Sequence, residues 1–573
     1  FFAHTFLSPA CRTLPLMTQQ ADATRTLNVN VGILGHVDSG KTSLSRALST
    51  TGSTAAFDKN PQSKERGITL DLGFSSFVTD LPEQFADQPY DRMQVTLVDC
   101  PGHASLIKTI IGGAQIIDLM MLVIDLGKGI QTQTAECLVI GEILNDKMIV
   151  VLNKLDTLPA DSRDEKLAKM QTRIKKTLSA TKFSDAPLVP VAARPGGADG
   201  SGGGAALDLP PSAPLGIDEL VATIKRHMVL PKRTPQGPLH FAIDHCFPIK
   251  GQGTVLTGTI ISGAMKIGQE IEFPELKQSR KIKSMQMFKK PVSVATQGDR
   301  LGVCVTQLDA KALERGIACS PGYIVTVDIA LMAVRHIRFF KAVCKTKVKF
   351  HVTVGHATVM GTATFFGKRA EPLDPSADDK SLKAAQALRQ LELARQRLPD
   401  TFDTEAEYEY QDELDPQSNE QWAVVELEAP IACALPATAI GSHLDTDINV
   451  NTCRLAFHGK MLRSLSRAEL RELKIFKHKR KDGQIDRVHD ERTLICKNLF
   501  KPGTDMTQFF GMQVQIGASG PLGLIESTFG KTKFKCAFQD PGPKGLAEAC
   551  KGEKLYLRYK RFVFDDSKKM VQS

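Results

Sequence analysis

The stretch Gly35-His36-Val37-Asp38-Ser39-Gly40-Lys41-Thr42 decides the fold of the first part of this chain. An apolar run, residues 29–34, precedes it, and Leu44 and Leu48 follow at helical spacing. Strand, glycine-rich loop and helix in this order are the setting of the phosphate-binding loop G-x-x-x-x-G-K-S/T. A glycine-rich turn without a ligand is the alternative, but it leaves the flanking strand and helix unexplained. We predict that the phosphates are bound by Gly35, Asp38, Ser39, Gly40, Lys41, Thr42 and Ser43, with the Lys41 ammonium on the β- and γ-phosphates and the Thr42 hydroxyl on Mg²⁺.

Two later segments carry groups suited to a γ-phosphate and its metal ion. Residues 66–71, R-G-I-T-L-D, follow a polar loop, and the hydroxyl of Thr69 is suited to Mg²⁺. An apolar strand over residues 95–98 leads into D-C-P-G-H. We expect Asp99 to support Mg²⁺ through water and the backbone N–H of Gly102 to meet the γ-phosphate. Segments of this kind are ordered by a γ-phosphate and released on hydrolysis.

Residues 153–156, N-K-L-D, predict the identity of the base. A carboxylate at Asp156 can accept from both the N1–H and the 2-amino group of guanine, and adenine has no matching pair of donors. The pattern is common by chance in isolation, but here it follows the other three segments in order. We therefore predict that GTP or GDP is bound, with the base contacted by Asn153, Lys154, Asp156, Ala192 and Ala193.

The arrangement of strands and helices predicts several domains. Strands and helices alternate over residues 26–232, which is typical of a doubly wound α/β domain with the nucleotide at the carboxyl ends of the strands. A glycine-rich loop, residues 195–214, is expected to be a flexible insertion in it. Short alternating strands with glycine turns then predict two β-barrels, residues 233–322 and 323–465.

Residues 369–420 are expected to interrupt the second barrel. We predict a helix from Asp379 to Leu398 and an exposed acidic loop from Glu405 to Glu413. The apolar positions with helical spacing in that helix are Leu382, Ala385, Leu388 and Leu391.

Residues 466–573 form a further domain with two basic stretches. Residues 474–481 are densely cationic, and a solvated loop is the alternative interpretation of them. Residues 554–561 alternate, with Leu555, Leu557 and Tyr559 on one face of a strand. A β surface of Arg, Lys and Tyr suits RNA, because cations neutralise phosphates and aromatic rings stack on bases. The predicted RNA contacts are Lys474, Lys477, Lys479, Arg480, Lys481, Arg558 and Lys560.

Composition narrows the class of protein. The 573 residues carry a net charge of +10, which is mild for a nucleic-acid-binding protein, so the position of the charge matters more than its total. No apolar run reaches the length of a membrane span. Twelve cysteines occur without a C-x-x-C pair, which argues against a zinc ribbon and against a disulfide scaffold. Residues 1–25 are expected to be a leader or disordered.

The four nucleotide segments together resemble the translational GTPases related to elongation factor Tu. The segments R-G-I-T-L-D-L-G, N-K-L-D and P-V-A-A are similar to those of the eukaryotic selenocysteine-specific elongation factors, and the similarity runs from about residue 28 to the end. One departure is Ala192, where a Ser-Ala pair is usual, and its backbone N–H is expected to remain available to guanine. The resemblance implies a GTPase, stimulated by the ribosome, that brings selenocysteinyl-tRNA to UGA codons.

The resemblance also implies roles for four more residues. His103 would orient the attacking water, and Asp244, His245 and Arg300 would receive the selenocysteinyl group. A selenol is ionised at neutral pH, so a cationic Arg300 and a protonatable His245 suit it. Neighbours on a regular strand point to opposite faces, so Asp244 and His245 share a pocket only at a strand end or a bulge. A purely structural Asp244–Arg300 pair is the alternative.

The implied partners are the ribosome, the long variable arm of the tRNA and the protein that binds the recoding element in the mRNA. We expect a cytoplasmic monomer without a membrane anchor, with nuclear shuttling left open. An initiation-factor subunit that binds tRNA is an alternative, but its zinc-knuckle cysteines are absent from this sequence. A regulatory GTPase that binds protein partners away from the ribosome is the other alternative, and the two barrels and the basic domain make it less suitable.

Overall fold

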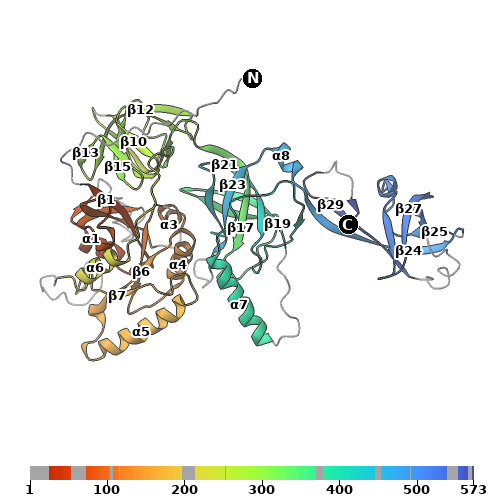
Figure 1. Cartoon of the computed structure of the whole chain (residues 1–573), viewed down its shortest axis with the longest axis horizontal. Helices are drawn as coiled ribbons and strands as arrows, with labels where there is room; N and C mark the ends of the chain where they lie inside the picture. The colour runs from red at the N-terminus through yellow and green to blue at the C-terminus, as the bar shows by residue number, and fades with distance from the viewer. Residues whose placement is uncertain are drawn as a thin grey trace, which may run out of the picture.

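The computed structural model describes residues 25–52, 72–102, 107–114, 116–195, 213–251, 253–368, 379–445, 453–490, 492–538, 553–565 and 571–572. Figure 1 shows an elongated molecule in which an α/β domain and a first barrel lie at one end, a second barrel in the middle and a C-terminal barrel at the other end. Among the described helices, none is long and apolar enough to cross a membrane.

The α/β domain is built on a seven-stranded sheet in the order β2-β3-β4-β1-β5-β6-β7. Strands β4, β1, β5, β6 and β7 run parallel, while β2 and β3 add an antiparallel edge. The strands are β1 (Thr26–Gly35), β2 (Thr51–Gly52), β3 (Gly73–Asp80), β4 (Arg92–Asp99), β5 (Leu119–Asp125), β6 (Met148–Asn153) and β7 (Leu188–Pro190). The helices are α1 (Lys41–Leu48), α3 (Ile107–Ala114), α4 (Thr132–Leu144), α5 (Arg163–Leu178) and α6 (Ile217–His227).

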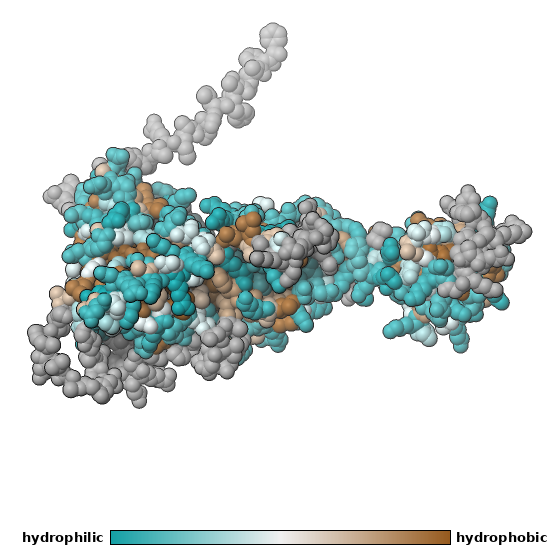
Figure 2. Space-filling view, turned by 90° about the horizontal axis from the view of Figure 1, so that it is seen from below, coloured by the Kyte–Doolittle hydropathy of each residue, from teal (hydrophilic) through white to brown (hydrophobic). Residues whose placement is uncertain are grey.

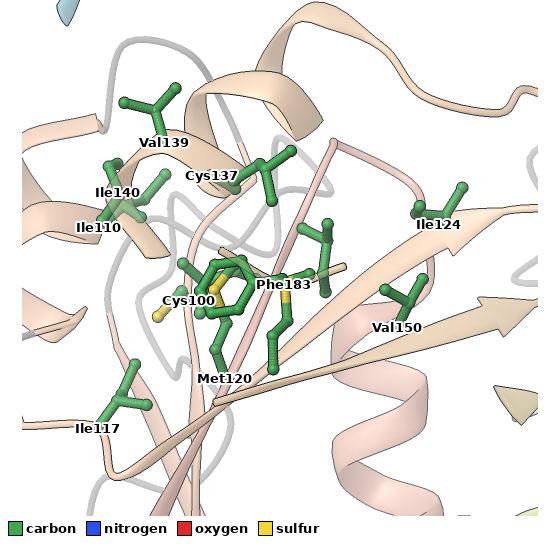
Figure 3. Close-up of a cluster of buried hydrophobic side chains, with 14 of the residues drawn as sticks. Cys100, Ile110, Ile117, Met120, Ile124, Cys137, Val139, Ile140, Val150 and Phe183 are labelled. Atoms are coloured by element: carbon green, nitrogen blue, oxygen red, sulfur yellow. The ribbon is translucent and has the colours of Figure 1, made fainter. Parts of the chain in front are cut away.

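Apolar side chains cover both faces of this sheet, as expected for parallel strands that are buried on both sides. All seven residues of β5 are buried. Figure 3 shows one core, in which Met120 of β5, Val150 of β6 and Ile140 of α4 meet. The same core continues into the second barrel, because Ile440 and Leu455 belong to it.

Six strands close the first barrel, in the order β11-β16-β8-β9-β15-β12 with β11 paired to β12, while β13 extends this sheet and β10 and β14 form a separate pair. Its inner face holds large apolar side chains such as Phe241 and Phe273. The strands are β8 (His240–Ile249), β9 (Gly253–Ser262), β10 (Ala264–Lys266), β11 (Glu270–Phe273), β12 (Gln278–Met287), β13 (Lys290–Val292), β14 (Val294–Thr296), β15 (Arg300–Val305) and β16 (Gly316–Cys319).

The second barrel is closed by the β18–β19 pair, with the order β18-β22-β23-β17-β21-β19. Burial alternates only in part along β18, because Val348 is exposed and Thr353 is buried. The strands are β17 (Val325–His336), β18 (Val348–Val354), β19 (Ala357–Gly367), β21 (Gln421–Cys433), β22 (Ala437–Ser442) and β23 (Leu455–Ser464).

The last domain is a third closed barrel, in the order β24-β25-β28-β27-β26-β29 with a closing β24–β29 pair. The described elements are α8 (Arg467–Glu472), β24 (Ile475–Val488), β25 (Thr493–Lys497), β26 (Gln513–Ile516), β27 (Leu522–Phe529), β28 (Lys533–Phe538), β29 (Lys554–Phe562) and β30 (Val571–Gln572). Figure 2 shows that this lobe joins the rest of the molecule through a narrow and largely hydrophilic neck. The predicted fold class, an α/β GTPase domain followed by two barrels and a β-rich domain, is therefore confirmed.

The insertion in the second barrel differs from its prediction at two places. Helix α7 (Asp379–Arg395) forms, but Leu388 of the expected apolar stripe is 58% exposed, whereas Leu393 is buried. The stripe is wrong at Leu388, and burial is greatest near the end of the helix, where Arg335 donates to the carbonyl oxygen of Gln396 at 2.7 Å.

The acidic segment is not simply an exposed loop, because it contains strand β20 (Tyr408–Tyr410). This strand pairs antiparallel with β19 and parallel with β24, so it connects the sheets of the last two barrels. Tyr410 is buried, and Tyr408 stacks on Phe402 with ring centres 4.9 Å apart. Phe402 in turn packs against Trp422 of the second barrel, with ring centres 5.0 Å apart. Alternating aromatic residues therefore turn this acidic segment into a strand.

Candidate nucleotide site and cargo-binding surfaces

The phosphate loop lies between β1 and α1, where two glycines hold conformations that other residues rarely adopt. Gly40 has φ +89°, and Gly35 has φ +150°. A Cβ atom at Gly35 would lie 2.4 Å from the carbonyl oxygen of Val123, so the loop closes against β5 only because that position has no side chain. The predicted residues of the loop are therefore brought together at the start of a helix, where backbone N–H groups and the helix dipole favour an anion.

Lys41 is buried within this loop and suits an anionic ligand. Its ammonium donates to the carbonyl oxygen of His36 at 2.8 Å. Burial lowers the pKa of Lys41, although the charge of Asp99 opposes that effect. Gly102 closes over it, because a Cβ atom there would lie 2.3 Å from the ammonium nitrogen. A phosphate group placed here would compensate a buried cation, so these residues fit the predicted triphosphate.

The predicted metal ligands meet at the carboxyl end of β4. The Thr42 hydroxyl donates to the Asp99 carboxylate at 2.7 Å. Hydroxyl and carboxylate oxygens are the ligands that Mg²⁺ prefers, so this pair fits the ion. Thr69 and His103 lie outside the described residues.

The base-recognition loop follows β6 and is tied to the phosphate loop by Asn153. Its side-chain amide donates to the carbonyl oxygen of Ser39 at 2.9 Å and accepts from the N–H of Ala193 at 3.1 Å. Lys154, with φ +65°, forms a 2.9 Å ion pair with Asp125, a residue that the sequence did not single out. Burial raises the pKa of Asp125, but hydrogen bonds from Lys154 and from backbone N–H groups outweigh it, so the pKa is lowered.

The structure corrects one expectation about the base site. The N–H of Ala192 donates to the carbonyl oxygen of Leu215 at 3.0 Å, so it is not available to guanine as expected. The reason is an isolated antiparallel bridge between Ala192, which follows β7, and Leu215, two residues before the start of α6. Asp156 lies in the short 3-10 helix Leu155–Thr157 at the mouth of the loop and is half-buried.

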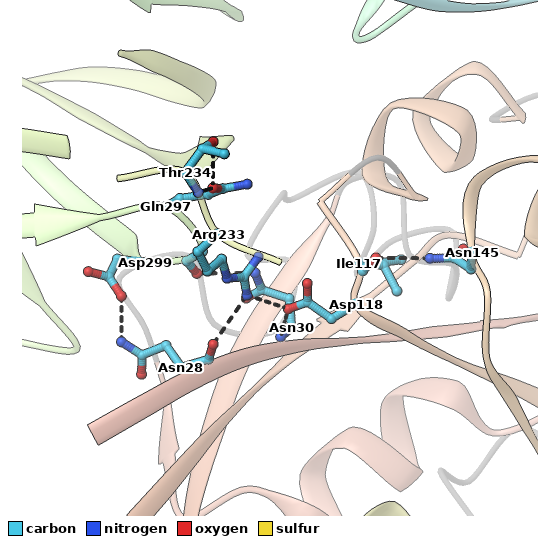
Figure 4. Close-up of polar contacts among 10 residues, drawn as sticks. Asn28, Asn30, Ile117, Asp118, Asn145, Arg233, Thr234, Gln297 and Asp299 are labelled. Atoms are coloured by element: carbon cyan, nitrogen blue, oxygen red, sulfur yellow. Dashed lines mark hydrogen bonds and ion pairs between the residues drawn. The ribbon is translucent and has the colours of Figure 1, made fainter. Parts of the chain in front are cut away.

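Polar contacts join the α/β domain to the first barrel (Figure 4). Asn28 of β1 donates to Asp299 at 2.5 Å, and Asn30 donates to the carbonyl oxygen of Gly298 at 3.1 Å. Arg233, in the connection between the domains, forms a 2.7 Å ion pair with Asp118. These contacts join residues more than a hundred positions apart, so no local pattern in the sequence indicates them.

Two Arg–Glu pairs join helix α4 to the second barrel. Arg454 donates to both carboxylate oxygens of Glu136, at 3.0 and 2.8 Å, and both side chains are about 5% exposed or less. Arg338 donates to both oxygens of Glu142 at 2.9 and 3.0 Å. The nucleotide-binding domain and the second barrel therefore share an apolar core and a desolvated ionic interface.

Of the three residues predicted for the selenocysteinyl pocket, the structure brings Arg300 and Asp244 into contact. Arg300 is buried and donates to Asp244 at 2.5 Å. Its guanidinium also lies over the ring of Phe74 on β3, with the carbon atom 3.0 Å from the ring centre. Strand β8 has a register shift between Ile243 and His245, which is the kind of irregularity that the two neighbouring residues require to share a pocket.

Asp244 also lines a cavity of about 1000 Å³ between the α/β domain and both of the first two barrels. His240 and His356 lie on its wall, and burial lowers the pKa of both imidazoles. Gly73 on β3 pairs with Asp99 in the sheet, next to the register position of Phe74. Phe74, whose ring lies under Arg300, is therefore one residue along β3 from the partner of Asp99, the residue predicted to support Mg²⁺.

The two basic stretches of the C-terminal barrel lie side by side. Strands β24 and β29 pair antiparallel, with Arg480 opposite Arg558. On β29, Leu555, Leu557 and Tyr559 are buried as predicted. Arg480 also lies 4.3 Å from the ring centre of Tyr556. The stretch 474–481 is therefore mostly a strand, and the alternative of a solvated loop is wrong for it.

Comparison with known proteins finds a match for each of the four domains. Residues 26–229 match the elongation factor Tu GTP-binding domain, and residues 253–318 match elongation factor Tu domain 2. Residues 331–459 match the third domain of eukaryotic selenocysteine-specific elongation factors, and residues 471–549 match their C-terminal RIFT domain. The selenocysteine-specific elongation factor of Mus musculus is 47% identical over 96% of this chain and 100% of its own length. The chain belongs to the selenocysteine-specific elongation factors.

Other members of this family agree with that assignment. The selenocysteine-specific elongation factor of Methanocaldococcus jannaschii is 36% identical over 58% of this chain and 66% of its own length. The crystal structure of the elongation factor SelB of Methanococcus maripaludis in complex with the GTP analogue GPPNHP has a TM-score of 0.66 and 27% identity, covering 94% of this chain and 100% of that one. Its apo form gives a TM-score of 0.64 at 26% identity. The chain is thus a GTPase of the elongation factor class, as predicted.

Proposed function

We propose that this selenocysteine-specific elongation factor binds selenocysteinyl-tRNA in its GTP state and delivers it to the ribosome at recoded UGA codons in the cytoplasm. The observation that carries the proposal is the match over the full length of the mouse factor, which includes the C-terminal barrel. Competition among charged tRNAs for binding, with and without residues 466–573, tests it. Selenocysteinyl-tRNA should bind in preference to the other charged tRNAs only when the chain includes residues 466–573. Equal binding of all charged tRNAs by the full chain would refute the proposal.

GTP hydrolysis in this proposal depends on groups that converge on Lys41. Lys41 and the loop N–H groups hold the phosphates, and Gly102 lies against the γ-phosphate position. Thr42, Thr69 and Asp99 would hold Mg²⁺, which would neutralise charge that develops on the phosphates. His103 orients the attacking water.

Replacement of His103 separates binding from hydrolysis. His103→Ala should bind GTP like the parent chain but should lose hydrolysis in the presence of ribosomes, because only the position of the water is affected. GTP affinity and turnover with ribosomes are the two measurements. His227→Ala, at the last residue of helix α6, is the matched control. Normal stimulated turnover in His103→Ala would contradict the role.

The selenocysteinyl pocket is proposed at Arg300, Asp244 and His245. Asp244 partly neutralises Arg300 as the structure stands. An incoming α-ammonium group would compete for the Asp244 carboxylate, and Arg300 would then be available to the selenolate. His245, just after the bulge in β8, would add a second donor to the selenolate. The pocket therefore prefers a ligand that brings one cation and one anion together.

The test is the ratio of affinities for selenocysteinyl-tRNA and its seryl form. Arg300→Ala should reduce that ratio by roughly tenfold or more, since a charge-assisted hydrogen bond contributes about 1.5–3 kcal/mol. Arg280→Ala, an arginine of the same barrel that bonds only within its own sheet region, is the control. An unchanged ratio in Arg300→Ala would remove this residue from cargo selection.

RNA binding by the C-terminal barrel is proposed at the β24–β29 surface. Arg480 and Arg558 are exposed and lie opposite one another on the two strands, so two guanidinium groups are presented side by side, and Asp482 pairs with Arg480 at 2.8 Å. Tyr556 beside them can stack on a base. The long variable arm of the tRNA supplies both phosphates and bases, and the protein that binds the recoding element in the mRNA is a further proposed partner.

A further inference from the structure

Three lysines of the predicted RNA surface are paired with carboxylates of the insertion. Lys474 lies 2.8 Å from Glu405, Lys477 lies 3.1 Å from Asp412, and Lys560 lies 2.6 Å from Glu407. These carboxylates belong to one short segment, residues 405–412, which is called the acidic strand below. Three of the seven cations predicted from the sequence therefore face another part of the same chain.

The acidic strand is held in place by more than charge. Its central residues pair with β24 in a parallel ladder, with Tyr408 opposite Ile475 and Glu409 opposite Phe476. The ammonium of Lys477 lies 3.5 Å from the ring centre of Tyr410, which is itself buried. A backbone ladder and a buried aromatic anchor keep the carboxylates along the lysines in a fixed order.

The other predicted RNA contacts have different surroundings. Lys479 and Arg558 are exposed at the barrel end of the same two strands. Arg480 pairs with Asp482 on its own strand, 2.8 Å away, rather than with the insertion. Lys481 is half-buried, with its ammonium over the rings of Phe500 and Phe509. The basic surface therefore has an inner half covered by the acidic strand and an outer half in which Lys479, Arg480 and Arg558 are exposed.

We propose that the acidic strand is an internal competitor of RNA, which holds Lys474, Lys477 and Lys560 so that RNA phosphates meet only the outer cations. Carboxylates spaced along an extended backbone present negative charge to a row of lysines much as a phosphate backbone does. The strand would thereby reduce binding of unspecific RNA while leaving the outer surface to the tRNA. This inference rests on the proposed RNA binding of the C-terminal barrel.

Neutralisation of the acidic strand tests the inference. The variant Glu405→Gln, Glu407→Gln, Asp412→Asn of the full chain should bind oligouridylate roughly fivefold or more tightly at low salt. The slope of log affinity against log salt should become steeper by about 2, because each additional cation that reaches a single strand contributes about 0.7. The matched control, Asp161→Asn, Asp164→Asn, Glu165→Gln, changes the net charge equally on the remote α5 region and should leave both values unchanged.

Replacement of the three lysines completes a double-mutant cycle with the three carboxylates. Lys474→Gln, Lys477→Gln, Lys560→Gln should change oligouridylate binding little in the parent chain, because the acidic strand already occupies these cations. In the neutralised background the same three changes should abolish the gain. Loss of binding on lysine replacement in the parent chain would mean that RNA contacts these lysines directly, and it would overturn the inference.

Two other outcomes are also decisive. Equal affinity and slope in the parent and the neutralised variant would overturn the inference, and so would an equal gain in the α5 control. The proposed delivery function has a separate test in the tRNA competition, so its failure would not be mistaken for failure here. Retained GTP binding shows that the α/β domain of every variant is folded, and an unchanged far-ultraviolet circular dichroism spectrum shows the same for the barrels.

Discussion

The second barrel has two joints, and they are built differently. Toward the α/β domain, Glu136 and Arg454 are almost completely buried, and the apolar core continues across the interface. Toward the C-terminal barrel, the joint also has apolar side chains, but its ion pairs are at the surface: the carboxylates of Glu405 and Asp412 are both 84% exposed. The Arg454–Glu136 pair at the first joint, with the α/β domain, is therefore shielded from water, whereas the carboxylates at the second joint, with the C-terminal barrel, remain in contact with water.

The difference predicts which joint responds to ions and RNA. Exposed pairs contribute about 0–1 kcal/mol each and weaken as salt rises, whereas a buried pair is screened much less. Loss of one partner of a buried pair leaves a desolvated charge and is costly. We therefore expect the nucleotide-binding domain and the second barrel to stay together under conditions that loosen the C-terminal barrel.

The largest effect is expected at the first joint. Glu136→Ala should destabilise the contact between the α/β domain and the second barrel by about 3–5 kcal/mol, because Arg454 would lose the carboxylate it faces in a buried position. Calorimetric thermal unfolding checks this, with an earlier transition expected for these two domains. Glu165→Ala, which removes an exposed carboxylate from α5, is the control and should shift the transition little. A shift of similar size in both variants would contradict the difference between the joints.

An intermediate effect is expected where the insertion helix meets both domains. Leu393 lines a small hollow of about 60 Å³ together with Glu142 of α4 and Arg335 of the second barrel. Leu393→Ala should cost about 2–3 kcal/mol, since truncation of a buried leucine loses apolar contacts and leaves a cavity. Leu388→Ala, in the same helix but exposed, should change the unfolding temperature hardly at all. Equal effects would mean that α7 packs through a different face.

The smallest effect is expected at the second joint. In the parent chain, a rise in salt from about 0.05 to about 0.5 M should loosen the C-terminal barrel by at most roughly 1–2 kcal/mol in total, because its three lysine pairs are partly exposed. The distance between labels on the second and C-terminal barrels, measured by energy transfer, reports this change. The variant with a neutralised acidic strand should lose the salt dependence. A distance that is insensitive to salt in both chains would show that backbone pairing alone holds the joint.

The sequence was sufficient for features that depend on neighbouring residues. The phosphate loop is recognised from Gly35, Gly40 and Lys41 within eight positions. The alternation of Leu555, Leu557 and Tyr559 with polar residues predicts the strand in which they lie. The fold class followed from such local patterns and is confirmed. Residue roles in cargo binding and hydrolysis remain predictions, and those of Thr69 and His103 lie outside the described residues.

The features that sequence reasoning missed depend on distant residues. Arg454 meets Glu136 from 318 positions away, and nothing near either residue indicates the other. Residues 405–413 of the insertion were predicted to be an exposed loop because their charge dominates their pattern. A signal was present, since Tyr408 and Tyr410 stand two apart as in a half-buried strand, but the acidic residues between and around them obscured it.

The aromatic contacts at the base of the insertion have a practical consequence. The chain contains a single tryptophan, Trp422, and Phe402 of the insertion rests edge-on against it. Indole fluorescence depends on the polarity and packing around the ring. All tryptophan fluorescence of this factor therefore comes from the site where the insertion contacts the second barrel. The fluorescence of an unlabelled sample therefore reports whether the contact between Phe402 and Trp422 is kept when tRNA binds.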